Sequence, residues 1–189
     1  MSFTTFISSF ALCFYAVSFV TEKLKLRGRR VKTDLDRGSL ALYDVTGLLS
    51  VPSGIVLGFT DYGRVRYGPE FIAASGLCML VAGTLLRRAA VRQLWDYFTL
   101  NVSILEGQRI VRRGLYGRVR HPSYAGLLLR YLGLGLAFAN WASAALIFLP
   151  ILCATVYRMR VEEEALARHF GEEYTDYCRE TRRLVPGVY

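Results

Sequence analysis

Two short polar clusters carry the residue types that could do chemistry. Residues 114–124 contain two arginines, an imidazole and two phenols, and residues 158–164 contain two arginines followed by three consecutive glutamates. An arginine fork suits a carboxylate, and a glutamate suits an amino group or hydroxyls. Each cluster alone also fits a purely structural role, because arginines beside a membrane span set topology and glutamates favour a helix N-terminus.

The composition indicates that these clusters sit in a membrane protein. Apolar residues make up 53% of the 189-residue chain and the mean hydropathy is +0.29, above the roughly 45–50% apolar content of soluble domains. The length allows one domain. We therefore expect an all-α, multi-pass integral membrane protein in which residues 1–189 form a single membrane domain, with N-terminal spans in residues 1–92.

Apolar runs predict about five transmembrane helices. A helix needs about 20 residues to cross the hydrocarbon core. A cleaved signal peptide is disfavoured for the first run, which lacks a basic start. The last run is too long for one crossing and has Asn140 at its centre, so it reads as a tight hairpin of two spans. The runs are Phe3–Thr21, Leu40–Thr60, Phe71–Leu86 with a continuation through Arg87 and Arg88, and Tyr124–Tyr157.

The basic residues predict the orientation. Lys and Arg number seven in residues 22–38, eight in residues 87–123 and six from Arg158 onward, whereas the hairpin turn has none. By the positive-inside rule the N-terminus is outside and the C-terminus cytoplasmic. The membrane would be a bacterial or archaeal cell membrane or the endoplasmic reticulum. The net charge of +9 then reflects topology and anionic lipid rather than nucleic acid.

The hairpin should bring the two polar clusters together. His121 and Arg158 are each about 18 residues from Asn140, so antiparallel arms of about 27 Å return them to one membrane depth. The four cysteines and two histidines show no metal-ligand spacing, and no metal is expected.

The clusters also resemble those of a known family. Residues 114–126 read G-x-Y-x-x-x-R-H-P-x-Y-x-G, which resembles the signature of isoprenylcysteine carboxyl methyltransferases and related phospholipid methyltransferases. Arg158-x-x-x-Glu162-Glu163 is similar to the C-terminal half of that family, as is a later series of residues. The later series is Phe170-Gly171, Tyr174, Tyr177 and Pro186. The resemblance covers residues 93–189, the expected methyltransferase core, and residues 1–92 match only as generic spans.

The resemblance implies an enzyme that transfers a methyl group from S-adenosyl-L-methionine to a lipophilic acceptor, leaving S-adenosyl-L-homocysteine. Arg158 is then a candidate clamp for the cofactor carboxylate, with Glu162 and Glu163 as acceptors. The implied catalytic residues are His121, Arg158 and Glu163. The implied cofactor-binding residues are Tyr116, Arg120, His121, Pro122, Tyr124, Arg158, Glu162 and Glu163. A helix from Val161 to about Glu180 would cover the cofactor or rest on the membrane surface.

The acceptor stays open at this point. Prenylated cysteine carboxylate is one expectation, and a phospholipid or other small lipophile is the alternative, favoured by Trp95-Asp96-Tyr97-Phe98. A carboxylate acceptor is already ionised near neutral pH, whereas an amine or thiol would need His121 as a base.

Two ionisable residues lie within the expected spans. Asp44 and Arg130 sit at similar depths, which predicts a buried ion pair or, for Arg130, contact with an anionic head group. A transporter that uses this pair, or an adaptor without chemistry, is a weaker alternative. A soluble methyltransferase is excluded because no strand–glycine-loop–helix unit is present. Gly133-x-Gly135 is expected to allow close helix packing instead.

Overall fold

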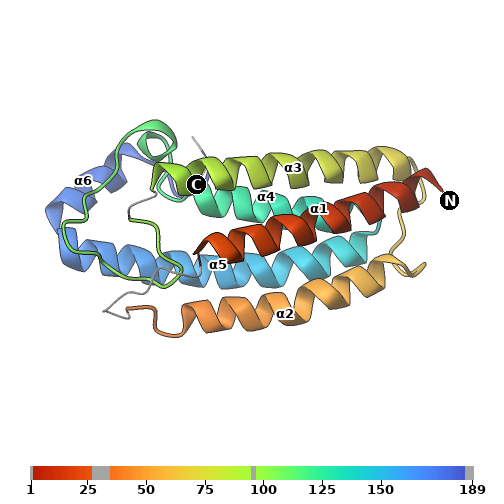
Figure 1. Ribbon diagram of the computed structural model, residues 1–189, viewed down its shortest axis with the longest axis horizontal. Helices are drawn as coiled ribbons and strands as arrows, with labels where there is room; N and C mark the ends of the chain where they lie inside the picture. Colours follow the sequence, from red (N-terminus) through yellow and green to blue (C-terminus); the bar gives the residue numbers. More distant parts are fainter. Residues whose placement is uncertain (1, 27–34, 95–96, 186–189) are drawn as a thin grey trace.

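The helices of the protein lie roughly along one axis (Figure 1). The computed structural model describes residues 2–26, 35–94 and 97–185. In this part of the chain the backbone is helical or irregular, with only isolated β-bridges, so the predicted all-α class is confirmed. The elements are α1 (Phe3–Leu26), α2 (Ser39–Gly58), α3 (Pro69–Gln93), the 3-10 helix η1 (Gly114–Gly117), α4 (Pro122–Leu136), α5 (Trp141–Phe170) and α6 (Glu172–Glu180).

Four of these helices are long and apolar enough to cross a membrane, namely α1, α2, α3 and α5. They correspond to the first three predicted spans and to the second arm of the predicted hairpin. The first arm is α4, whose 15 residues give a helix of about 23 Å, shorter than the roughly 30 Å hydrocarbon core. α1 continues to Leu26, beyond the predicted end at Thr21, and so carries Glu22 and Lys23.

The predicted hairpin between α4 and α5 is present, and Asn140 organises its turn. Its Oδ1 accepts a hydrogen bond from the Ser143 amide at 3.0 Å, which caps the first turn of α5. Its Nδ2 donates to the Tyr62 carbonyl oxygen at 2.8 Å, which ties the turn to the α2–α3 loop. Because both ends of this amide are bonded, the turn is fixed where the polar centre of the apolar run predicted it.

The C-terminal half of the hairpin differs from the prediction. We expected a span ending near Tyr157 and a separate helix from Val161 to about Glu180, and this division is wrong. α5 is continuous to Phe170, and the break comes at Gly171, whose φ of +54° favours glycine. The second polar cluster therefore lies on the same helix as the second arm of the hairpin.

Glycines bring α3 and α4 into close contact. A Cβ atom added at Gly83 would lie 2.4 Å from the Arg130 amide nitrogen, and one at Gly133 would lie 2.3 Å from that of Leu80. Gly135 approaches α5 in the same way, with a Cβ position 2.5 Å from the Ala144 Cα. The predicted packing role of the two α4 glycines is confirmed, and small residues at such contacts are typical of membrane helices.

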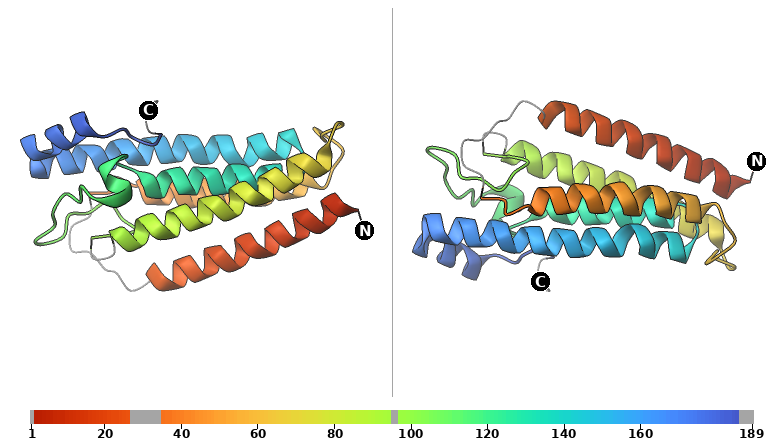
Figure 2. Two further views of the ribbon diagram at one scale, coloured as in Figure 1. Left: turned by 90° about the horizontal axis from the view of Figure 1, so that it is seen from above. Right: turned by 90° about the horizontal axis from the view of Figure 1, so that it is seen from below.

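The irregular segments gather at the two ends of the bundle (Figure 2). The segment between α3 and α4 and the short helix α6 lie beyond one end, where α1, α3 and α5 finish and α2 and α4 begin. The α2–α3 loop and the Asn140 turn lie at the other end. The basic segments and the polar clusters thus share one end of the molecule. Part of the first basic segment, residues 27–34, lies outside the described residues.

Candidate active site

The first polar cluster is held in place by a C-terminal strap, defined here as residues 181–184. The Arg120 amide donates to the Arg182 carbonyl at 2.7 Å, and the His121 amide donates to the Arg183 carbonyl at 3.0 Å. The Arg120 guanidinium adds a bond to the Thr181 carbonyl at 2.6 Å. Pro122 then begins α4, where its missing N–H is no loss. The strap therefore fixes the backbone on which His121 sits.

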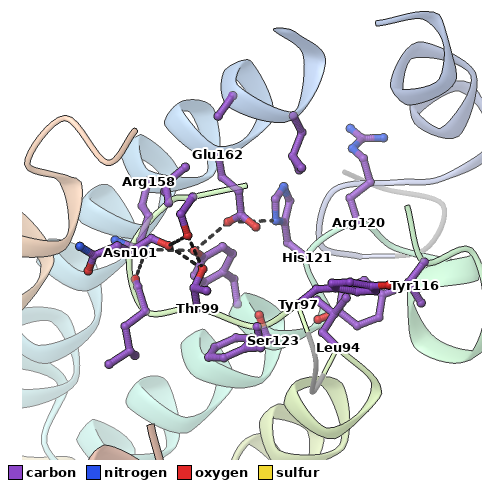
Figure 3. A pocket seen from close by; sticks show the side chains of 18 of the residues that line it. Leu94, Tyr97, Thr99, Asn101, Tyr116, Arg120, His121, Ser123, Arg158 and Glu162 are labelled. Carbon is purple, nitrogen blue, oxygen red and sulfur yellow. Dashed lines mark hydrogen bonds and ion pairs between the residues drawn. The ribbon is translucent and has the colours of Figure 1, made fainter. Parts of the chain in front are cut away.

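The second polar cluster meets the first across the hairpin, as predicted. His121 Nε2 lies 3.1 Å from Glu163 Oε1, and its Nδ1 lies 3.9 Å from Glu162 Oε2. The Tyr124 hydroxyl donates to Glu162 Oε2 at 2.9 Å. Figure 3 shows Glu162, His121 and Arg120 around the same hollow. Residues from the start of α4 and the second half of α5 thus form one polar wall.

Glu163 lies behind this wall rather than on it. Its carboxylate is shared by His121, Arg120 at 3.2 Å and Arg183 at 2.7 Å, and its side chain is 13% exposed. Neither Glu163 nor Pro122 belongs to the lining of the cavity described below. The geometry makes Glu163 a residue that orients the imidazole and anchors the strap.

Arg158 is engaged by protein groups at all three guanidinium nitrogens. Nε donates to the Tyr124 hydroxyl at 3.0 Å, and Nη1 donates to Asp36 Oδ1 at 2.9 Å. Nη1 also reaches the Ser39 hydroxyl at 3.2 Å, and Nη2 donates to the Leu100 carbonyl oxygen. These bonds make Arg158 a link between α5, α2 and the segment after α3, and its side chain also lines the cavity described below.

Asp36 is a site residue that the sequence reasoning missed. Its buried carboxylate accepts hydrogen bonds from the amides of Leu40 at 2.7 Å and Val102 at 3.1 Å. Burial alone would raise its pKa, but these amides, the Ser39 hydroxyl and Arg158 together hold the pKa below its usual value. An acidic residue just before a helix start was the signal that could have identified it.

The predicted pair between Asp44 and Arg130 is wrong. Asp44 Oδ1 pairs with Lys23 Nζ at 3.0 Å, and Arg130 Nη1 pairs with Glu22 Oε2 at 2.8 Å. The reason is the extra length of α1, which places two charged side chains between α2 and α4. Glu22 Oε1 also accepts a hydrogen bond from Arg87 Nε at 2.5 Å. The sequence signal for Glu22 was its position as the first charge after the first apolar run.

One cavity joins the polar wall to this charged cluster. Its empty space, counted together with the open solvent at its mouth, is about 1460 Å³. Most of the predicted site residues line it, and they come from η1, the turn between η1 and α4, and helices α4, α5 and α2. These residues are Tyr116, Arg120, His121, Tyr124, Arg158, Glu162, Arg130 and Asp44. Leu166, Phe170, Tyr174 and Tyr177 also line it, which supports the predicted cover over the site. Trp95, Asp96 and Pro186 lie outside the described residues.

Comparison with known proteins bears directly on this hairpin. Residues 76–168 match the model of the isoprenylcysteine carboxyl methyltransferase (ICMT) family, and this range contains both polar clusters. The chain is ICMT-like. Protein-S-isoprenylcysteine O-methyltransferase B of Arabidopsis thaliana is 31% identical over 120 residues, which is 62% of this chain and 61% of that protein.

Further relatives agree with the ICMT-like assignment. The Protein-S-isoprenylcysteine O-methyltransferase of Mus musculus is 33% identical over 122 residues, covering 62% of this chain and 42% of that protein. The chain thus spans less than two thirds of the length of these curated relatives. The solved structure of the eukaryotic intramembrane Ras methyltransferase ICMT matches with a TM-score of 0.60 at 21% identity, over 78% of this chain and 53% of that one. That match shows a shared membrane fold.

Proposed function

We propose that this chain is an integral membrane methyltransferase that uses S-adenosyl-L-methionine and acts on a lipophilic acceptor. The observation that carries the proposal is the continuous cavity. Its polar wall contains His121 and Glu162, while its other end reaches Phe19 and Leu40 between α1 and α2. A water-soluble donor and a membrane-dissolved acceptor could meet in such a space. The names of the relatives favour isoprenylcysteine carboxyl O-methylation, and a phospholipid or other small lipophile is the alternative acceptor.

The donor set of the cavity fits the cofactor. The Tyr174 hydroxyl is buried, lines the cavity and meets no hydrogen-bond partner within the described residues. The Glu162 side chain is one-third exposed, and its carboxylate accepts a hydrogen bond from the Tyr124 hydroxyl. Aromatic faces for an adenine are supplied by Phe170 and by residues of the segment after α3. A carboxylate, an unpartnered phenol and an arginine suit the amino acid and ribose parts of the cofactor.

Each predicted site residue therefore receives a proposed task. Residues that line the cavity would contact the cofactor, and residues behind the wall would position them. The first group is Tyr116, Arg120, His121, Tyr124, Arg158 and Glu162, and the second is Pro122 and Glu163. When bound, the cofactor supplies a sulfonium methyl group that an acceptor atom attacks in line, leaving a thioether.

The hydrogen-bond partners of His121 indicate which of its ring nitrogens carries the proton. With the Nε2 proton donated to Glu163 Oε1 at 3.1 Å, Nδ1 is the nitrogen left to accept a proton. A carboxylate acceptor arrives ionised and needs no base, so positioning would supply most of the rate enhancement. An amine or thiol acceptor would instead lose its proton to His121 Nδ1.

We further propose five membrane crossings, with the N-terminus outside and the C-terminus cytoplasmic. α4 would be the fifth, short crossing, packed against α3 and α5 rather than facing lipid along its length. The clustering of the polar and basic segments at one end supports this orientation. Residues 93–189 would form the methyltransferase core and residues 1–92 the supporting spans, within a bacterial or archaeal cell membrane or the endoplasmic reticulum.

The cofactor end is tested by calorimetry of the purified protein with S-adenosyl-L-homocysteine. Glu162→Gln should weaken binding by roughly 10- to 100-fold if a charged hydrogen bond worth about 1.5–3 kcal/mol is lost. Glu164→Gln is the matched control, because Glu164 lies two positions away and its side chain is 52% exposed. The proposal is refuted if the wild-type protein shows no saturable binding of S-adenosyl-L-homocysteine.

The acceptor end is tested by transfer of a labelled methyl group into lipid extracts. Label that appears in base-labile esters would support a carboxyl acceptor, and label in base-stable amines would support a phospholipid. A protein that binds the homocysteine product but labels no lipophile would contradict the proposed reaction.

A further inference from the structure

Five exposed arginines lie on three connected segments at the end of the bundle that carries the polar clusters. The segments are the last turns of α3, the chain around η1 and the C-terminal strap. The Leu115 amide in η1 donates to Gln93 Oε1 at 3.0 Å, which joins η1 to α3. The Arg182 amide donates to the Arg118 carbonyl oxygen at 3.2 Å, which joins the strap to the chain after η1. We call this surface the arginine face, and its members are Arg88, Arg92, Arg113, Arg118 and Arg182.

The arginine face has no carboxylates of its own. Within the described residues, none of its five side chains forms an ion pair. Like charges held close together repel one another unless counter-charges join them. The three segments that form the face contain no Asp or Glu, and they are residues 88–94, 113–121 and 181–185.

Exposed arginines on the neighbouring α5–α6 side are treated differently. Arg168 pairs with Glu164 at 3.3 Å, and Arg179 pairs with Asp176 at 2.9 Å. The positive-inside rule accounts for the number of arginines at this end of the molecule, but it does not require that one side be neutralised and the other left bare. The arginine face therefore indicates a partner that supplies negative charge from outside the chain.

The position of the arginine face along α3 matches the head-group region of a bilayer. One side of α3 is exposed and apolar from Phe71 to Leu85, which are 75% and 58% exposed, and Arg88 and Arg92 continue this side of the helix. The two arginines lie about 5 and 10 Å beyond Leu85 along the helix axis. The polar region of each leaflet is roughly 5–8 Å thick. The side that faces lipid chains thus ends in guanidinium groups at the depth of the head groups.

A lipid with an uncompensated phosphate fits both properties. Guanidinium forks bind phosphate oxygens bidentately, and clusters of four to eight Lys or Arg just beyond a span are typical of anionic-lipid sites. A lipid is favoured over a soluble phosphate because the arginine face continues an apolar helix side, so one molecule can cover both. The proposed orientation places this end in the cytoplasmic leaflet, whose surface is negative.

The arginine face also belongs to the support of His121. The strap that holds the His121 amide through the Arg183 carbonyl, at 3.0 Å, is the segment that carries Arg182. The side chains of Arg118 and Arg182 bring two like charges to the backbone bridge between their segments. Like charges on paired segments weaken the pairing. Anionic head groups would neutralise both charges and so strengthen the bridge.

We propose that the arginine face binds the phosphate groups of anionic lipids and that this binding stabilises the C-terminal strap. The lipid composition of the leaflet then controls how firmly His121 is held. The inference goes beyond the proposed function, because it does not depend on which cofactor or acceptor enters the cavity.

Spin-labelled lipids measure the binding. The full-length protein is placed in phosphatidylcholine nanodiscs, and electron paramagnetic resonance reports the fraction of spin-labelled phosphatidylglycerol or phosphatidylcholine that the protein immobilises. One arginine near a membrane surface contributes about a factor of five, and the signal averages over the whole lipid shell, so we expect a preference for phosphatidylglycerol of about 2- to 5-fold. Salt at about 1 M, where the Debye length is about 3 Å, should remove it.

Matched double variants assign the preference to the arginine face. Arg88→Gln combined with Arg92→Gln should bring the two lipids close to equal immobilisation. Arg168→Gln combined with Arg179→Gln is the control and should keep the preference. It removes the same charge at the same end of the molecule, but from arginines that are already paired with carboxylates.

Hydrogen exchange at the His121 amide measures the effect on the strap. In the wild type, replacing part of the phosphatidylcholine by phosphatidylglycerol should slow this exchange by about 2- to 5-fold. Arg118→Gln combined with Arg182→Gln should remove the dependence on lipid charge. The bonds of the strap that involve these two residues use main-chain atoms, so the substitutions leave them in place.

Each contrary result overturns the inference. It fails if the wild type does not distinguish the two lipids, if the control double variant loses the preference as well, or if exchange at the His121 amide does not respond to lipid charge. Displacement of phosphatidylglycerol by equal amounts of free glycerol phosphate or of an acidic peptide would assign the face to a soluble partner and refute the lipid. Where a double variant does not assemble, the single variants Arg92→Gln and Arg182→Gln decide, because both side chains are exposed.

Discussion

Arg158 and Asp36 form a buried ion pair across 122 positions of the chain, with Nη1 2.9 Å from Oδ1. Their side chains are 7% and 5% exposed. The pair joins the middle of α5 to the segment just before α2, and the Leu100 carbonyl oxygen completes the junction. The wall that carries Tyr124 and Glu162 is therefore held by a part of the chain that the family model, which begins at residue 76, does not reach.

Asp36→Asn should destabilise the protein strongly. The change leaves the Arg158 guanidinium buried without its counter-ion, and breaking one partner of a buried pair costs about 3–5 kcal/mol. The free energy of unfolding can be measured by titration with a denaturing detergent in mixed micelles. Asp61→Asn serves as the control because the Asp61 side chain is 93% exposed beside Arg64. Equal losses for the two variants would contradict a special role of the buried pair.

The same carboxylate should make stability depend on acid. The pKa of Asp36 is lowered in the folded protein, so its stabilisation is complete above the unfolded pKa of about 3.9 and is lost as the pH falls through the folded value. The melting temperature of the wild type should therefore fall more steeply below about pH 4 than that of Asp36→Asn. Parallel curves for the two proteins would show that Asp36 does not contribute to the acid transition.

Glu163→Gln should loosen the C-terminal strap. The substitution removes the charge that holds Arg183 at 2.7 Å and His121 at 3.1 Å. Hydrogen exchange at the His121 amide, which donates to the Arg183 carbonyl, should become faster by about 10-fold or more if one to two kcal/mol of local stability is lost. Glu164→Gln changes the next residue, which is exposed and pairs with Arg37. It should leave this exchange unchanged.

Gly83→Ala should weaken the contact between α3 and α4. Its new Cβ would lie 2.4 Å from the Arg130 amide nitrogen, and because backbone cannot rotate away, the helices must separate at a cost of about 1–3 kcal/mol or more. Gly47→Ala in α2 is the matched control. There the Cβ would lie 3.7 Å from Ile151 Cδ1, an ordinary contact, so helix propensity should stabilise the variant by up to about 1 kcal/mol. Detergent unfolding of both variants measures the difference.

The helical class and the hairpin followed from simple physical signals in the sequence. Long apolar runs predicted where helices lie, and Asn140 predicted where the last run turns. The meeting of His121 with Glu162 and Glu163 followed from equal arm lengths, because a helix rises by a fixed amount per residue. These features depend on local spacing, which a sequence displays directly.

The partners of the buried arginines could not be predicted in the same way. Arg130 pairs with Glu22 rather than Asp44 because α1 continues one turn beyond the apolar run, and apolar content does not report where a helix ends. Arg158 meets Asp36 through an irregular segment that has no periodicity. Pairings of this kind depend on rotation and register between helices, which a single sequence does not encode in any short pattern.

The length of α5 makes the site sensitive to the bilayer itself. Its 30 residues extend about 45 Å, roughly 15 Å more than the hydrocarbon core, and the same continuous helix carries both an apolar run and Glu162. A thicker or thinner bilayer changes the tilt of such a long helix through hydrophobic mismatch. Because His121 stands on α4 and Glu162 on α5, a relative tilt changes their separation. For the proposed methyltransferase, turnover should then vary with the acyl-chain length of the host membrane, because bilayer thickness would set the distance between these two side chains.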